Sequence, residues 1–161
     1  MNLRRIVLVI MLLGGCSNEF DNTHKEMPAD FDFSLKYGVY GKEEINTFKD
    51  FIVKDLVEDG TVQASLILNE QDMIDIYNEM KTLNIMDEHE LKKEEGCEFE
   101  PPSLSVWEIH MNGETKKFSY QGYCETPPDV LKLYQLEEFI RKIIIHKEEY
   151  KKLPAVNGGY E

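Results

Sequence analysis

The stretch SLSVWEIHMNGETKKFSYQ, residues 103–121, decides the fold. Asn112-Gly113 lies at its centre between two runs in which apolar and polar residues alternate, and this dipeptide is the strongest short-range signal of a β-hairpin. A two-residue turn fixes the register and places Trp107 opposite Phe118 on the buried face. The same register sets Met111 opposite Glu114, Ile109 opposite Lys116, Val106 opposite Ser119 and Glu108 opposite Lys117.

Three further strands are predicted upstream of this hairpin. Apolar and polar residues alternate over 31–39 and again over 61–68, which is typical of half-buried strands. The run 47–57 between them is β-rich but alternates less cleanly. Asp59-Gly60 provides the positive φ that a tight turn needs. Together these runs predict a three-stranded meander.

Two amphipathic helices complete the pattern. Asn69 is predicted to cap the first helix, with Asp72 at its third position and a stop at Asn84. Thr126 is predicted to cap the second helix, which frays by Lys152. The apolar stripes are Met73, Ile76, Tyr77, Met80 and Leu83 in the first helix, and Val130, Leu133, Tyr134, Leu136, Ile140, Ile143 and Ile144 in the second. The solvent face of the second helix is predicted to be Glu137, Glu138, Arg141, Lys142 and Lys147.

The order β-β-β-α-β-β-α predicts an α+β fold, an antiparallel sheet of about five strands with both helices packed on one face. The alternative is a final hairpin that stands apart from the first three strands. Residues 31–153 are expected to form one domain, and the 154–161 tail is either disordered or docked through Tyr160.

The first sixteen residues indicate export. Arg4 and Arg5 precede the apolar run Ile6–Leu13, and Leu13-Gly14-Gly15-Cys16 closes it, which describes a secretory signal peptide. Eight helical residues rise only about 12 Å, too little to cross a hydrocarbon core of about 30 Å. One interpretation is an ordinary secretory signal peptide in which Cys16 occurs by chance.

Leu13-Gly14-Gly15-Cys16 also resembles the lipobox of bacterial lipoproteins. This resemblance implies that residues 1–15 are removed and that Cys16 carries the acyl chains, such as palmitate. Residues 17–30 are mostly polar and have no apolar period, so residues 16–30 are predicted to form the lipidated cysteine and a flexible tether. With the acidic domain and the YKKLP…GGY ending, the chain resembles small lipoproteins of Gram-positive bacteria, a group that offers no catalytic residues to transfer. The implied location is the extracytoplasmic face of the cell membrane. In a Gram-negative cell, Ser17 would also be compatible with sorting to the outer membrane.

The charge of the mature chain excludes some partners. Removal of residues 1–15 leaves 146 residues with 16 Lys and Arg against 31 Asp and Glu, a net charge of −15. Such a field opposes binding to nucleic acid, whose phosphates need basic residues. It also opposes contact with an anionic membrane surface, so the acyl chains must hold the protein there. The favoured partners are cations or surfaces with a basic patch.

Cys97 and Cys124 remain after Cys16 is assigned, and an oxidising compartment favours a disulfide between them. The bridge would close a loop of about 28 residues, which contributes roughly 3–4 kcal/mol in the chain-entropy model. A redox-active pair is disfavoured because the Cys-x-x-Cys spacing is absent. Two unpaired thiols are the other alternative.

The acidic segment 87–102 offers candidate metal ligands: Asp87, Glu88, His89 and Glu90, with Glu94 and Glu95 beyond them. Their oxygens suit calcium, and the addition of His89 or Cys97 would suit zinc. Neither the calcium-loop nor the His-x-x-x-His zinc spacing is present, so we expect a solvated loop with no metal and no cofactor. The common catalytic motifs are also absent from the sequence. The first hypothesis is therefore a non-enzymatic binding or accessory module for a protein or cell-envelope ligand. The alternative is an envelope hydrolase or metal-dependent enzyme that uses residues 87–100.

Overall fold

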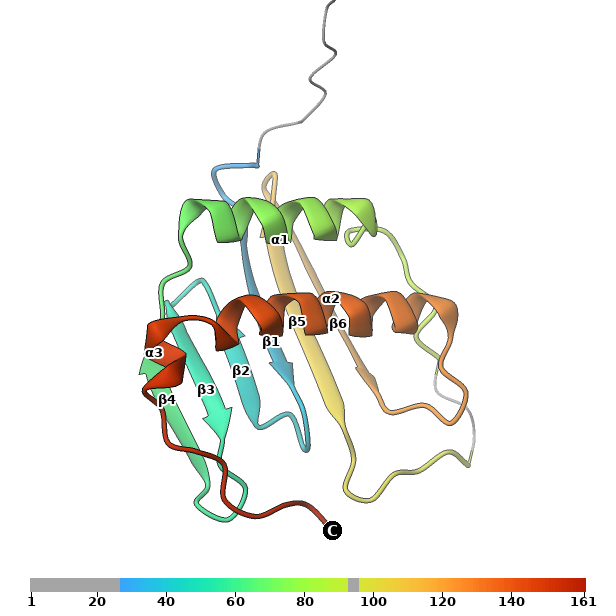
Figure 1. Ribbon diagram of the computed structural model, residues 1–161. Coiled ribbons are helices and arrows are strands. Elements are labelled where there is room, and N and C mark those ends of the chain that lie inside the picture. The colour runs from blue at the N-terminus through green and yellow to red at the C-terminus, as the bar shows by residue number, and fades with distance from the viewer. Residues whose placement is uncertain (1–26, 93–95) are drawn as a thin grey trace, which may run out of the picture.

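The structure is a computed structural model, and it describes residues 27–92 and 96–161. It contains one antiparallel six-stranded sheet in the order β4-β3-β2-β1-β5-β6, with α1 and α2 lying across one face (Figure 1). The elements are β1 Asp32–Tyr37, β2 Glu43–Asn46, β3 Phe51–Asp55, β4 Thr61–Ser65, α1 Glu70–Thr82, β5 Leu104–Met111, β6 Glu114–Gln121, α2 Pro128–Ile145 and α3 Glu148–Lys151. The predicted α+β class is confirmed. The proposed signal peptide, Cys16, Glu94 and Glu95 lie outside the described residues.

The hairpin forms in the predicted register. Trp107 lies opposite Phe118, and Met111 lies opposite Glu114 across the turn. The Asp30 carboxylate accepts hydrogen bonds from the backbone amides of Asn112 and Gly113 at 2.9 and 2.6 Å, so the start of the domain is fastened to this turn. β5 also pairs with β1, so the hairpin belongs to the same sheet and the alternative of a separate hairpin is wrong.

The strand count differs from the prediction because residues 43–46, which no predicted strand includes, form β2, while the first four residues of the predicted run 47–57 form a turn. The chain turns at Thr47–Asp50, where Asp50 has φ of +51°, a value that short polar residues tolerate better than branched ones. The amide of Leu66 donates to the Asp50 carbonyl at 2.9 Å and fixes this turn. β2 therefore precedes the turn, β3 follows it, and the sheet has six strands instead of five.

Both helices begin near the predicted residues, but only one has the predicted cap. The Asn69 side chain accepts from the Asp72 amide and the Asp72 carboxylate accepts from the Asn69 amide, each at 2.9 Å, which completes a capping box. The predicted Thr126 cap is wrong. Pro127 is the N-cap of α2 and makes no side-chain capping bond, because the chain reaches helical geometry one residue later at Pro128.

The core lies between the sheet and the two antiparallel helices (Figure 1). Among the described residues, the apolar side chains that are under 2% exposed are Phe33, Leu35, Ile45, Ile52, Ile76, Met80, Ile85, Trp107, Ile109, Val130, Leu133, Leu136, Ile140 and Ile144. Within the described residues, no helix is both long and apolar enough to cross a membrane.

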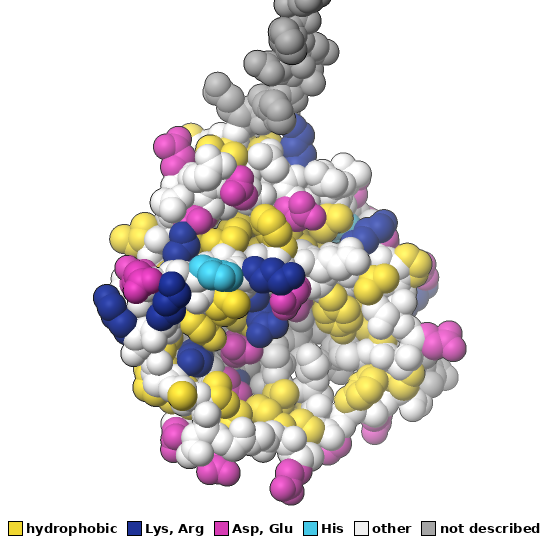
Figure 2. All heavy atoms as spheres, viewed as in Figure 1, with side chains coloured by type: hydrophobic (Ala, Val, Ile, Leu, Met, Phe, Trp, Pro, Cys, Tyr) yellow, Lys and Arg dark blue, Asp and Glu magenta, His cyan; other side chains and the backbone are white. Residues whose placement is uncertain are grey.

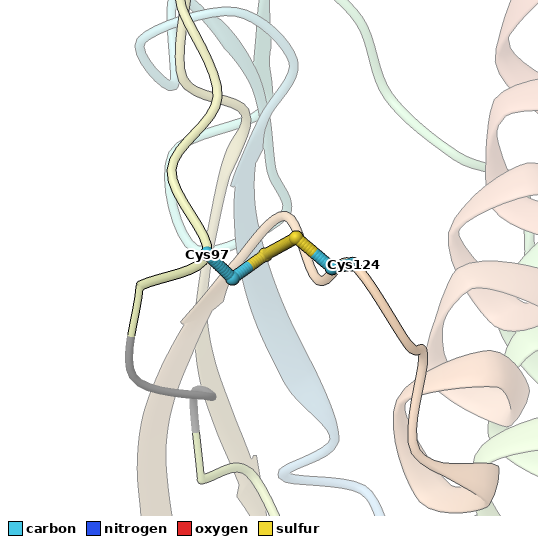
Figure 3. The surroundings of a disulfide bond; sticks show 2 residues. All are labelled: Cys97 and Cys124. Atoms are coloured by element: carbon cyan, nitrogen blue, oxygen red, sulfur yellow. A yellow bond between two sulfur atoms is a disulfide. The ribbon is translucent and has the colours of Figure 1, made fainter.

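Cys97 and Cys124 form a disulfide in the structure, with their Cα atoms 5.8 Å apart (Figure 3). Cys124 lies in the segment that leads into α2, and Cys97 lies in the loop that precedes β5. The bridge therefore ties the acidic loop to the start of the second helix, as predicted.

The C-terminal tail is docked on the domain, so of the two alternatives for residues 154–161 the docked one is correct. Asn157 forms a bridge with Val57, and its amide donates to the Leu56 carbonyl at 3.2 Å. The Tyr160 hydroxyl donates to Asp55 and accepts from the Lys42 ammonium group at 2.8 Å.

Candidate functional site

The face of the sheet that lies under the helices carries an apolar row of side chains and, next to it, a mostly polar row. One row is apolar on all six strands: Ala64, Ile52, Ile45, Leu35, Trp107 and Phe118. Two residues further along each strand, the same register gives Val62, Lys54, Glu43, Tyr37, Ser105 and Tyr120. We call the five polar members of this second row, Lys54, Glu43, Tyr37, Ser105 and Tyr120, the polar row. An inward-facing row is normally apolar, so this row is the first indication of a site.

Helix α2 contributes two charged residues to the polar row. Glu137 and Arg141 are four residues apart and therefore lie one above the other on the same side of the helix. Both were predicted to face solvent. For Glu137 that prediction is wrong, since its exposed fraction is 8%. The cause is geometric: position 137 follows Leu136 at the edge of the apolar stripe, close enough to the sheet for a long side chain to reach Tyr120.

The Glu137 end of the site is a closed hydrogen-bond network. The Tyr120 hydroxyl donates to Glu137 Oε1 and accepts from Trp107 Nε1 at 3.4 Å. The Ser105 hydroxyl also hydrogen-bonds the Glu137 carboxyl. Burial raises the pKa of Glu137, while these donors act in the opposite direction. Burial also raises the pKa of Tyr120, and the neighbouring Glu137 raises it further.

The Glu43 end of the site is more open. The Arg141 guanidinium lies over the Tyr37 ring, 5.7 Å from its centroid. Glu43 is half-buried directly opposite Tyr37 in the adjacent strand. Burial raises the pKa of Glu43, and the charges of Arg141 and Lys54 only partly offset this effect. The pKa of Tyr37 is also raised, mainly by burial and then by Glu43.

Lys54 and Tyr150 close the site on the side of α3. The Lys54 ammonium group lies 5.0 Å from the centre of the Tyr150 ring and donates to the Pro154 carbonyl at 2.7 Å. Tyr150 is half-buried, and its pKa is raised by burial and by Glu43. The tail and the short helix therefore hold Lys54 in place beside Glu43.

The surface beside these residues is hollowed. Figure 2 shows the helix-covered side of the molecule, on which the surface recedes between α2 and the loops at the lower end, while Lys and Arg side chains gather over α2 and α3. The polar row follows Leu35 and Trp107 toward that lower end, where β1 ends at Tyr37 and β2 begins at Glu43, and these strand ends lie below α2 on the side of the hollow. A carboxylate that accepts hydrogen bonds and a guanidinium that donates them lie side by side here, which suits the binding of a small polar ligand.

The candidate ligands predicted from the acidic loop are placed apart from this site. His89 packs against the Phe118 ring, 6.0 Å between centroids, and its Nε2 lies 3.3 Å from the Ile85 carbonyl oxygen. The Glu90 amide donates to Asp129 at 3.3 Å, while Asp87 and Glu88 are exposed. Residues 27–92 and 96–161 contain no group of three or more His, Cys, Asp or Glu side chains arranged to hold a metal ion.

A second depression lies on the opposite face of the sheet. It measures about 620 Å³ and is lined by Ser34, Lys36, Val106, Trp107, Glu108, Lys117, Phe118 and Ser119. Its charged groups are already paired, Lys117 with Glu108 at 3.0 Å and Lys36 with Glu44 at 3.7 Å. This depression is shallow and its charges are neutralised in place, so it offers less to a ligand than the polar row does.

The sequence carries part of the information needed to locate the polar row. Tyr37 belongs to the predicted apolar face of its strand, and the hairpin register places Ser105 opposite Tyr120. The pairing of β1 with β5 brings these residues together, and that pairing cannot be read from either strand alone.

Comparison with protein-family models and with curated proteins finds no match for this chain.

Proposed function

We propose that this chain is an extracytoplasmic lipoprotein, anchored by acyl chains on Cys16, whose domain is a non-enzymatic binding module for a ligand of the cell envelope. The observation that carries the binding role is the polar row, where the charged Glu43 and Arg141 both neighbour Tyr37 at the lower ends of β1 and β2 instead of completing an apolar core. Buried ionisable groups with shifted pKa values are concentrated at functional sites in proteins. No catalytic motif in the sequence assigns a reaction to them.

The location is supported by three features. The lipobox-like segment Leu13–Cys16 follows an apolar run that is too short to span a membrane. A disulfide is typical of proteins folded outside the cytoplasm, and Cys97 and Cys124 form one here. The described chain begins at Met27 near the β5–β6 turn, at the opposite end of the domain from the hollow (Figure 1). A membrane tether that enters at Met27 would leave the hollow facing away from the membrane.

Anchoring is tested by the intact mass of the protein recovered from a membrane fraction. We expect a chain that begins at Cys16 and carries acyl mass on that residue, and we expect a Cys16→Ala variant to lose the acyl mass. A protein that retains Met1 would overturn the proposed anchor.

Binding is tested by retention of envelope material on the immobilised full mature protein. Solubilised cell-wall fragments and membrane extract are passed over the wild type and over Glu43→Gln and Arg141→Met, and retained compounds are identified by mass spectrometry. The matched controls are Glu44→Gln and Lys142→Met, adjacent residues with the same change of charge that lie outside the site. We expect the two site variants to lose a compound that the wild type and both controls retain. Equal retention by all five proteins would refute the proposed site.

A further inference from the structure

Glu43 and Arg141 present opposite charges to one hollow without forming an ion pair with each other. Arg141 is paired with Glu138 at 2.9 Å and lies over the Tyr37 ring. Over the described residues, neither a hydrogen bond nor an ion pair reaches the Glu43 carboxylate. Glu43 interacts with Arg141 and Lys54 only through longer-range attraction. A half-buried acceptor without a protein donor is suited to a donor that a ligand supplies.

Gly38 lies next to this carboxylate. It has φ of +80°, a conformation that glycine adopts without strain, and it turns the chain directly after β1. A Cβ atom at this position would lie 2.9 Å from Glu43 Oε2, the end of a flexible side chain that can move away. The turn, and not the carboxylate, therefore requires the glycine.

Neighbouring charges limit the kinds of ligand that fit. A simple anion would be attracted by Arg141 and repelled by Glu43. A simple cation would be attracted by Glu43 and repelled by Arg141. Lys54 is engaged by the Pro154 carbonyl and the Tyr150 ring. Arg141 uses only Nη1 in its pair with the exposed Glu138, so its other N–H groups are donors for a ligand anion. A guanidinium binds a carboxylate through two parallel hydrogen bonds, and a carboxylate accepts hydrogen bonds from an ammonium group.

We infer, resting on the binding function proposed above, that the recognised part of the ligand is an α-amino acid group, whose ammonium meets Glu43 and whose carboxylate meets Arg141. Two sources share this chemistry: a free amino acid, and a peptide whose γ-linked glutamyl end keeps both charges on one carbon. The Tyr37 ring under Arg141 restrains the guanidinium, so less side-chain freedom is lost on binding.

The test is isothermal titration calorimetry on the full mature protein in detergent. The probes are alanine, N-acetylalanine, which lacks the ammonium, alaninamide, which lacks the carboxylate, γ-glutamylalanine and N-acetylglucosamine. We expect alanine or γ-glutamylalanine to bind, and N-acetylalanine and alaninamide each to bind at least roughly tenfold more weakly, because each loses one charge-assisted contact. Binding of γ-glutamylalanine without alanine would identify a peptide end as the source, and the reverse would identify the free amino acid. These ligand analogues test the inference without depending on whether a variant folds.

Two variants then assign the contacts. Glu43→Gln should weaken binding of the charged probe at least roughly tenfold, and Arg141→Met should do the same. Glu44→Gln and Lys142→Met should leave binding unchanged. Binding of N-acetylglucosamine in place of the amino acid probes would overturn the inference and leave the proposed function standing. If no probe binds, but Glu43→Gln and Arg141→Met still fail to retain the envelope compound that the wild type retains, the amino acid inference is overturned and the proposed binding function is not. If no probe binds and retention is also unaffected by the variants, both proposals are refuted.

Discussion

The network between Tyr120 and Glu137 gives a direct test of what holds α2 on the polar row. Tyr120→Phe removes a single hydroxyl, which donates to Glu137 and accepts from Trp107. Tyr120 is 4% exposed and Glu137 is 8% exposed, so solvent cannot easily replace the lost donor. Removing one partner of a buried hydrogen bond to such a group costs about 1.5–3 kcal/mol. Domains of this size unfold with a free energy of about 5–15 kcal/mol, so the loss is a large share of the total.

The chain contains one tryptophan, Trp107, and that residue belongs to the network, so its fluorescence in urea follows unfolding of the site itself. With a slope of about 1.5 kcal/mol/M, the unfolding midpoint should fall by roughly 1–2 M urea. Tyr134→Phe is the matched control. Tyr134 lies 5.5 Å from the Tyr120 ring, and no hydrogen bond of its hydroxyl is present within the described residues. The control should change the unfolding free energy by less than about 0.5 kcal/mol. If Tyr120→Phe costs no more than Tyr134→Phe, the network does not fasten the helix and the reasoning is refuted.

The same set of contacts supports four further predictions. Burial raises the pKa of Glu137, so this group stabilises the fold fully below its unfolded pKa and loses that contribution as the pH rises through its folded pKa. The unfolding free energy of the wild type minus that of Glu137→Gln should therefore fall as the pH rises above the ordinary glutamate pKa in urea titrations, and a flat difference would contradict the raised pKa. Replacement of Cys97 and Cys124 by serine should lower the unfolding free energy by roughly 3–4 kcal/mol, and an equal midpoint in reduced and oxidised wild type would argue against the bridge. Asn69→Ala removes the capping box of α1 and should cost about 1 kcal/mol in the same assay; no loss would mean that the cap contributes nothing to stability. Glu43→Gln should raise the unfolding free energy by on the order of 0.5–2 kcal/mol, because it removes a half-buried charge; destabilisation would show that Glu43 has a structural role.

The parts of the fold that could be predicted from the sequence are those fixed by local chemistry. Asn112-Gly113 set the hairpin register, and Asn69 with Asp72 set the start of α1, because turns and caps depend on a few neighbouring residues. The turn at Asp50 was missed because it lies inside a β-rich run and depends on a left-handed residue other than glycine. The predicted strand therefore began in the turn, and β2 at Glu43–Asn46 was not predicted, which left the sheet one strand short.

The candidate site was missed for a different reason. Its residues are separated by up to about a hundred positions in the chain, and they meet only because β1 lies between β2 and β5 while α2 crosses above them. Helical periodicity placed Glu137 on the solvent side, because its position at the edge of the apolar stripe becomes buried only when the helix is docked. The acidic loop was considered as a metal site because it is rich in Asp and Glu. Composition alone does not show whether such side chains lie close enough together to bind a ligand.

The two buried carboxyl groups of the site differ in a way that separates structure from function. Glu137 receives hydrogen bonds from Tyr120 and Ser105, so the free energy that its burial costs is offset within the protein. Glu43 is also taken from water, but the described residues supply it with nearby charges and no donor. The adjacent row of the sheet shows that the same strands pack apolar residues without difficulty, with Ile45 only two positions from Glu43. An apolar side chain at position 43 would thus serve packing better than a carboxylate. Residues that do not suit the packing around them are concentrated at functional sites in proteins. Within the polar row, Glu43 is the residue that packing explains least, and it is therefore the strongest candidate for a functional role.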